Sequence, residues 1–141
     1  AGDFDIVDNT LMDNYAPINR VNSGTYAARI NSDMNDTNFT YPNYSVSKLI
    51  KRVVLSAPDE EIFFHYAPVL WDPGTSHDGR KPTFLARVLD ENGVECDRIC
   101  HSAYTSDPFL LQSPSHSNVR YRDWSCASLD AFAMLTSSWK T

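Results

Sequence analysis

The sequence has no long apolar run, no excess of positive charge and no catalytic motif. No run of about 18 apolar residues occurs in its 141 residues, so nothing in it is expected to insert into a membrane. Its net charge of −6 argues against nucleic acid or an anionic membrane surface as a partner, since both attract basic proteins. There is no Gly-x-Ser-x-Gly elbow, no His-x-x-x-His and no His-Glu pair, so we do not expect an enzyme.

The pattern of an amphipathic helix is also lacking. No stretch keeps apolar residues at spacings of three and four over three turns between a cap and a stop. Instead, runs that favour β-strands alternate with short segments that carry Gly, Pro, Asn or Asp. These runs are TYAARI, SVSKLIKRVVLSA, EIFFHYAPVLW, TFLARVLD, VECDRICHSAY and NVRYRDWSCASL. The rhythm predicts a single all-β domain over residues 1–141, an antiparallel β-sandwich of jelly-roll type.

Two segments give the clearest local predictions. In SKLIKRVVL, residues 47–55, one face of the predicted strand carries Leu49 and Val53, and the other carries Ile50 and Val54. VLDENGVEC predicts two strands joined by a short turn, with Gly93 at the position that tolerates a positive φ.

Cysteine is scarce: Cys96, Cys100 and Cys126 are the three present. They contain no Cys-x-x-Cys pair, which argues against a structural zinc site. In an extended strand Cys96 and Cys100 would lie about 13 Å apart, at about 3.3 Å per residue, whereas a disulfide needs Cα atoms within about 7 Å. Either the strand breaks between them, or one of them bonds Cys126 from a neighbouring strand. We favour the second arrangement, which leaves one thiol over and indicates an oxidising compartment.

Acidic residues crowd the first eight positions, where Asp3, Asp5 and Asp8 occur. Hard oxygen ligands at close spacing suit Ca²⁺, although the glycine and glutamate of an EF-hand loop are absent. The alternative is a solvated acidic segment. We therefore treat Ca²⁺ as a hypothesis for these three residues.

The stretch VLWDPGTSHDGRKPTF, residues 69–84, concentrates polar chemistry between two apolar runs. Asp72 and His77 are expected to hydrogen-bond a structured loop to the sandwich. The sharper alternative is a ligand site formed by Trp71, Asp72, His77 and Arg80. Trp71 could stack on a sugar ring, and its alternative role is packing in the core or against the loop.

The longer stretch FFHYAPVLWDPGTSHDGRKPTFLARVLDENGVEC resembles a domain of large secreted and cell-surface proteins of Bacteroidetes bacteria, often found beside gliding-motility-associated modules. The likeness covers about residues 20–131, and the insertion TSHDGRK is longer than the family pattern. The residues that carry it are Tyr66-Ala67, Asp72-Pro73, His77, Pro82, Phe84, Asp90, Asn92-Gly93 and Cys96, with Arg29 upstream and Trp124 and SLDAF downstream.

The resemblance implies a galactose-binding-like jelly roll on a protein that is secreted or held at the cell surface. It implies a non-catalytic adhesive role, with a glycan or cell-surface polymer as the partner. The alternative is a structural subunit that joins other copies or neighbouring domains by strand addition. The family continues with further strands beyond the Trp, so the chain is a fragment, or closes its sandwich with DAFAMLTSSWKT, or accepts a strand from a partner.

Overall fold

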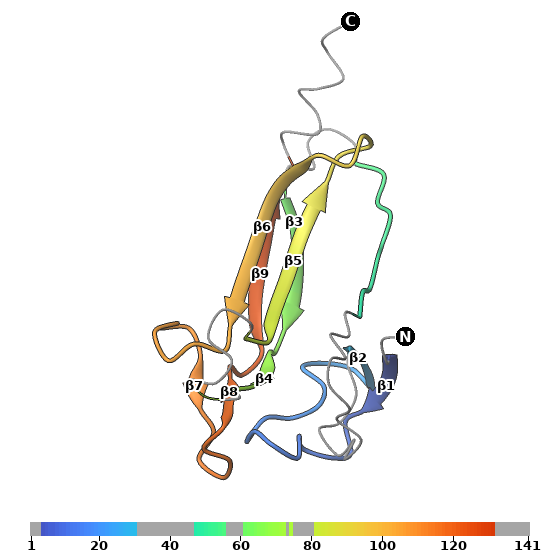
Figure 1. Ribbon diagram of the computed structural model, residues 1–141. Coiled ribbons are helices and arrows are strands. Elements are labelled where there is room, and N and C mark those ends of the chain that lie inside the picture. The colour runs from blue at the N-terminus through green and yellow to red at the C-terminus, as the bar shows by residue number, and fades with distance from the viewer. Residues whose placement is uncertain (1–3, 31–46, 56–60, 73, 75–80, 132–141) are drawn as a thin grey trace, which may run out of the picture. The chain divides into compact units, whose positions relative to one another are not determined.

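The structure, a computed structural model, describes residues 4–30, 47–55, 61–72, 74 and 81–131, and all regular structure in these residues is β (Figure 1). They form no helix, and hence no helix that could cross a membrane. This confirms the predicted all-β class. The strands are β1 (Phe4–Asp8), β2 (Tyr26–Ile30), β3 (Glu61–Tyr66), β4 (Val69–Trp71), β5 (Thr83–Leu89), β6 (Glu95–Ser102), β7 (Leu111–Gln112), β8 (Val119–Tyr121) and β9 (Ser125–Asp130).

The chain divides into two compact units. The first comprises Ala1–Met12 and Asn19–Val53, and the second comprises Asp13–Ile18 and Val54–Thr141. In the first unit β1 and β2 form an antiparallel pair in which Asp5 lies opposite Arg29. The strands discussed below belong to the second unit.

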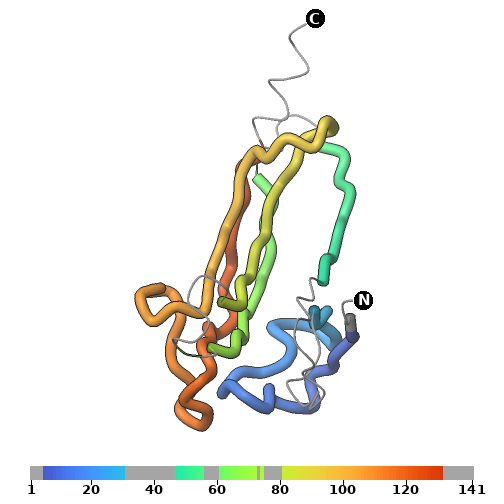
Figure 2. Tube along the Cα trace, in the orientation of Figure 1, coloured from blue at the N-terminus to red at the C-terminus, as the bar shows by residue number. Residues whose placement is uncertain are grey.

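Strand pairing in the second unit is nested. β3 pairs with β9, β4 pairs with β8, and β5 pairs with β6, so the first of these strands meets the last (Figures 1 and 2). β7 joins the other side of β8 and completes a three-stranded sheet. All the pairs are antiparallel. Antiparallel sheets are therefore confirmed.

The core of the second unit forms where the inner faces of two paired ribbons meet. Along β3 and β9 every second side chain is buried or half-buried, and Ile62 lies opposite Leu129. β5 alternates in the same way, and its Ala86 lies opposite Ile99 of β6. The period-two pattern thus brings two apolar faces together, which is consistent with a β-sandwich. The core cluster contains Val88, Leu129 and Ala131, surrounded by Leu55, Ile62, Phe64, Ala86, Cys96 and Ile99.

A side chain of β6 also ties the two ribbons together. The Asp97 carboxylate accepts a hydrogen bond from the backbone N–H of Asp130 on β9, at 2.8 Å. Asp97 lies opposite Val88, at the inner face of its ribbon. A backbone donor near the end of β9 is thereby satisfied at the margin of the core.

The turn between β5 and β6 has the predicted form. Gly93 has a φ of 81°, a left-handed value that glycine adopts without steric cost. The Asp90 carboxylate accepts hydrogen bonds from the backbone N–H groups of Asn92 and Val94, at 2.9 and 2.8 Å. The Asp90 side chain therefore stabilises the turn through hydrogen bonds to the turn's own backbone.

Some predicted strands are interrupted in the structure. EIFFHYAPVLW forms two strands, β3 and β4, which are separated by Ala67 and Pro68. Pro68 lacks a backbone N–H and cannot donate to a ladder, although its carbonyl accepts from the N–H of Arg122. Residues 47–55 have the predicted alternation but form no strand, since they pair with no other described residue.

The predicted disulfide is wrong: all three cysteines are free. Cys100 and Cys126 are exposed and lie opposite Leu85 and His65, which are exposed as well. Both thiols thus lie on outer faces, which point away from each other because the inner faces meet in the core. Cys96 is half-buried and packs against the core cluster. The prediction assigned cysteines to neighbouring strands without knowing which face each would occupy.

Truncation of the core is expected to weaken the fold strongly. Leu129 is 4% exposed, so Leu129→Ala should lower the free energy of unfolding by about 2–5 kcal/mol in a urea titration. The matched control is Leu85→Ala on the outer face, where the side chain is 47% exposed and the loss should be about 1 kcal/mol or less. Equal losses in the two variants would contradict the assignment of inner and outer faces.

Candidate functional site

The polar stretch singled out in the sequence begins at the end of β4. β4 pairs with β8, so that Trp71 lies opposite Val119. Val119 is only 1% exposed, whereas Trp71 is 38% exposed. The backbone N–H of Asp72 donates to the carbonyl of Asn118, which extends the pairing by one residue. Trp71 and Asp72 therefore stand on a fixed strand end.

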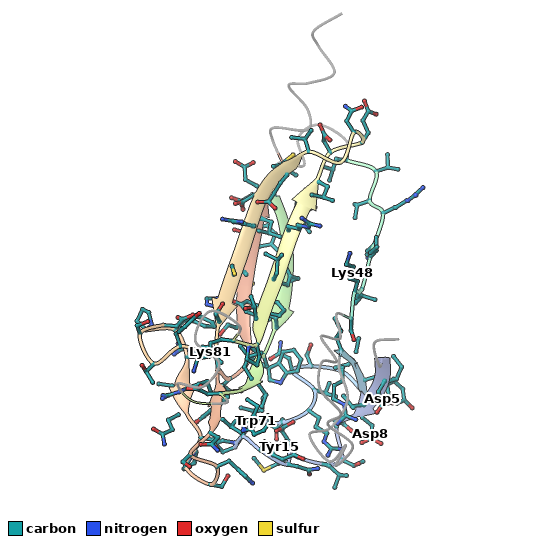
Figure 3. The ribbon with its side chains drawn as sticks, viewed as in Figure 1. Asp5, Asp8, Tyr15, Lys48, Trp71 and Lys81 are labelled. Atoms are coloured by element: carbon teal, nitrogen blue, oxygen red, sulfur yellow. The ribbon has the colours of Figure 1, made fainter. Side chains whose placement is uncertain are left out.

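The Asp72 carboxylate is the centre of a half-buried ion cluster. It forms a salt bridge with Lys81, and the two side chains are 11% and 6% exposed. Its second oxygen lies 3.9 Å from Nε of Arg120, which comes from β8. The backbone N–H of Gly74 donates a hydrogen bond to Oδ1 of Asp72 at 2.9 Å. The Lys81 ammonium group also donates to the Gly74 carbonyl at 2.8 Å. Figure 3 labels Trp71 and Lys81 within this part of the molecule.

These contacts set the charge state of Asp72. Burial raises the pKa of its carboxyl, but hydrogen bonds from Lys81 and Gly74 and the charges of Lys81 and Arg120 outweigh burial. The pKa therefore lies below its ordinary value, and the group is a carboxylate at neutral pH.

Asp72 thus contacts Gly74 and Lys81 of the stretch and Arg120 of the neighbouring strand. His77 and Arg80 lie outside the described residues, so their predicted roles remain predictions. Sequence reasoning missed Lys81 and Arg120. Lys81 could have been found, because it is a basic residue that closes the same loop. Arg120 gives no such signal, since only the pairing of β4 with β8 brings it close.

A second polar cluster lies beside the core. It consists of three side chains that are hydrogen-bonded in a row. The Tyr66 hydroxyl lies 3.1 Å from Nε2 of His101, and Nδ1 of His101 lies 3.3 Å from the Asp107 carboxylate. Tyr66 is 8% exposed. Desolvation raises the pKa of its hydroxyl, the charge of Arg122 lowers it, and that of Asp107 raises it.

Aromatic rings enclose this chain. The Tyr66 ring stacks on Phe84 with centroids 4.8 Å apart and planes 7° apart. His101 stacks on Phe109 at 4.0 Å, and the guanidinium carbon of Arg122 lies 5.0 Å from the centroid of the same ring. Both ring nitrogens of His101 therefore have a hydrogen-bond partner, the Tyr66 hydroxyl at Nε2 and the Asp107 carboxylate at Nδ1.

The Asp107–His101–Tyr66 chain has the residue types of a proton relay, but the geometry is that of a closed network. Both imidazole nitrogens are engaged, and the phenol at the end of the chain is buried. The network satisfies buried polar atoms at the edge of the core.

The acidic N-terminus shows two different local roles for its carboxylates. Asp5 forms a salt bridge with Arg29 at 2.9 Å. Asp8 accepts hydrogen bonds from the hydroxyl and the backbone N–H of Thr10, which lower the pKa of its carboxyl. Asp3 lies outside the described residues. Within the residues that the structure describes, no group of three or more His, Cys, Asp or Glu side chains is arranged to hold a metal ion.

Comparisons of the chain with protein-family models, with curated proteins and with solved structures found no match.

Loss of the Asp72 charge is expected to destabilise the fold in a pH-dependent way. At pH 7, Asp72→Asn should cost about 1.5–3 kcal/mol in a urea titration, because buried Lys81 loses a charge-assisted hydrogen bond. The folded-state pKa of Asp72 is lowered, so its contribution is complete above an unfolded pKa of about 3.9 and disappears as the pH falls through the folded value. The difference between wild type and variant should therefore shrink below about pH 4.

Asp5→Asn is the matched control for this experiment, because it breaks an ion pair whose side chains are 56% and 28% exposed. It should cost about 1 kcal/mol or less. A difference between wild type and Asp72→Asn that stays constant from pH 7 to pH 3 would contradict the ionic role of Asp72.

Proposed function

We propose that this chain is a non-catalytic binding module of an exported protein, secreted or at the cell surface, that binds a glycan or a cell-surface polymer. The observation that carries the proposal is the pairing of an exposed indole with a fixed carboxylate at the end of β4. Trp71 is 38% exposed, and the Asp72 carboxylate that follows it is held by Lys81, Arg120 and Gly74.

The chemistry of sugars fits this arrangement. A pyranose ring has an apolar C–H face that an indole covers, and its hydroxyls exchange hydrogen bonds with charged groups already fixed in position. Because Asp72 is ordered by its partners before any ligand arrives, little side-chain entropy would be lost on binding. Trp71 and Asp72 are thus the described members of the proposed site, and the residues predicted to join them are His77 and Arg80.

The absence of catalysis is part of the proposal. The strongest candidate for acid–base chemistry in the described residues is the Tyr66–His101–Asp107 chain. Its groups hydrogen-bond one another, and aromatic rings stack on Tyr66 and His101. A binding role would use the surface next to Trp71 and would not require the Tyr66–His101–Asp107 network to take part.

The finer architecture that we infer is a galactose-binding-like jelly roll. A jelly roll winds an antiparallel ribbon in which the first strand pairs with the last and the pairs nest inward. The order of pairing in the second unit, β3 with β9, β4 with β8 and β5 with β6, supports this topology. The resemblance to Bacteroidetes surface domains around residues 66–96 supports the proposed location.

The site is tested by removing its aromatic ring. The wild-type protein on a printed glycan array should retain a defined set of sugars, and Trp71→Ala should weaken titrated binding of the best one about tenfold, or about 1.4 kcal/mol. Tyr26→Ala is the matched control, since Tyr26 is an exposed aromatic residue of β2, 68% exposed. No retained glycan, or equal binding by wild type and Trp71→Ala, would refute the proposed function.

The Ca²⁺ hypothesis for Asp3, Asp5 and Asp8 is tested separately. An ion that binds only the native state raises the melting temperature as its concentration rises. We expect millimolar CaCl₂ to raise the melting temperature above that in chelator, and Asp5→Asn to reduce the increase. A melting temperature that is the same in chelator and in calcium would leave these residues as ordinary acidic groups.

A further inference from the structure

His65 and Cys126 lie directly opposite each other in the β3–β9 ladder. Both side chains are exposed, so they lie together on the outer face of this ribbon. Directly opposite residues of an antiparallel pair have Cβ atoms about 4.5–5.5 Å apart. An imidazole and a thiol that start from such positions can approach a common ion. The strand register thus brings together two metal-ligating side chains that are far apart in the sequence.

The His65–Cys126 pair stands on a strand that its inward-facing neighbours hold in place. On one side of His65, Phe64 packs against the core cluster. On the other side, Tyr66 is 8% exposed and stacks on Phe84. The spacing of the pair is therefore set by a packed ladder and not by a loop. Little order has to be created when a ligand binds to such a pair.

Neither member of the pair is engaged by another side chain that the structure describes. The imidazole of His65 and the thiol of Cys126 form no hydrogen bond with the described residues. The other two described histidines differ in this respect. His101 has a partner at both ring nitrogens, and Nδ1 of His116 lies 2.9 Å from the Ser115 hydroxyl. A ligand at the pair would thus displace no interaction with the described part of the chain.

The ladders place no histidine opposite the other two cysteines. Cys100 lies opposite Leu85 on the outer face of the β5–β6 ribbon. Cys96 is half-buried and packs against the core cluster. Cys126 is therefore the one cysteine with an imidazole directly across its ladder. The comparison also supplies a matched control, because Cys100 is an exposed strand thiol without the second ligand.

The ligand types of the pair select a borderline-soft cation. Zn²⁺ binds thiolate sulfur at about 2.3 Å and imidazole nitrogen at about 2.0–2.1 Å. Ca²⁺ and Mg²⁺ take oxygen ligands, so the pair does not suit them. The net charge of −6 also favours a cation over an anion as the ligand. The pair therefore differs in chemistry from the acidic residues near the N-terminus.

We propose that His65 and Cys126 form a surface site for Zn²⁺ on the outer face of the β3–β9 ribbon. The sulfur binds as a thiolate, its proton passes to solvent, and a ring nitrogen of the neutral imidazole is the second ligand. Glu61 and Asp130 lie four residues along each strand, or about 13 Å away at about 3.3 Å per residue, too far to bind the same ion. Since the described residues form no group of three ligands, water takes the remaining positions. This proposal does not depend on glycan binding at Trp71.

A titration with Co²⁺ tests the site, because Co²⁺ can take the place of Zn²⁺ and absorbs light. In a reductant that contains no thiol, the wild-type protein should develop a thiolate-to-cobalt charge-transfer band, which Zn²⁺ then abolishes. Cys126→Ser should abolish the band, and His65→Ala should raise the dissociation constant for Co²⁺ at least about tenfold. The matched controls, Cys100→Ser and His116→Ala, alter an exposed thiol and an exposed imidazole outside the pair and should change neither.

Alkylation of the wild-type protein tests the site without any substitution. Zn²⁺ should slow the reaction of Cys126 with iodoacetamide, measured by mass spectrometry of peptides, and leave the rate at Cys100 unchanged. This protection should weaken as the pH falls, because protons compete with the metal for both ligands. Equal or absent protection at the two cysteines, a cobalt band that survives Cys126→Ser, or a cobalt affinity that His65→Ala leaves unchanged would each overturn the proposal. Trp71→Ala and Asp5→Asn should leave zinc binding intact, which separates this test from those of glycan and Ca²⁺ binding.

Discussion

The pairing of β3 with β9 is the constraint on which the second unit depends. These strands lie far apart in the sequence, and their register sets Ile62 against Leu129 and Phe64 against Ala127. Once they are joined, the intervening chain must fold back on itself, and β4 with β8 and β5 with β6 form nested pairs inside that loop. Closing so long a loop costs entropy before many contacts repay it, so folding is expected to be slow compared with that of helical proteins of this size.

The two polar clusters of this unit illustrate different uses of buried charge. Tyr66, His101 and Asp107 form a row of side chains that hydrogen-bond one another, and aromatic rings stack on Tyr66 and His101. Asp72 instead lies at a strand end beside an exposed indole, and Lys81 and Arg120 hold its carboxylate in place. The first arrangement holds the edge of the core in place. The second holds a carboxylate in place beside an exposed aromatic ring at the surface.

The sequence was informative wherever a local pattern was sufficient. Alternation predicted the all-β class and the turn around Gly93, because side-chain period and a positive φ are local properties. Alternation does not state which strand pairs with which, so Arg120 could not be predicted beside Asp72. The same limit explains the wrong disulfide: Cys100 and Cys126 face outward on different ribbons. Residues 47–55 showed the converse, since their strand pattern has no pairing partner among the residues that the structure describes.

The irregularity in the β5–β6 ladder has a consequence for redox chemistry. The register passes from Val88 opposite Asp97 to Leu89 opposite Glu95, so Cys96 is the extra residue of a bulge. Its thiol packs against the core, and burial is the main cause that raises its pKa, so little thiolate forms there at neutral pH. Cys100 and Cys126, by contrast, are open to oxidants and to mixed disulfides. One inserted residue thus places Cys96 and Cys100, two thiols of the same strand, on opposite faces of the ribbon.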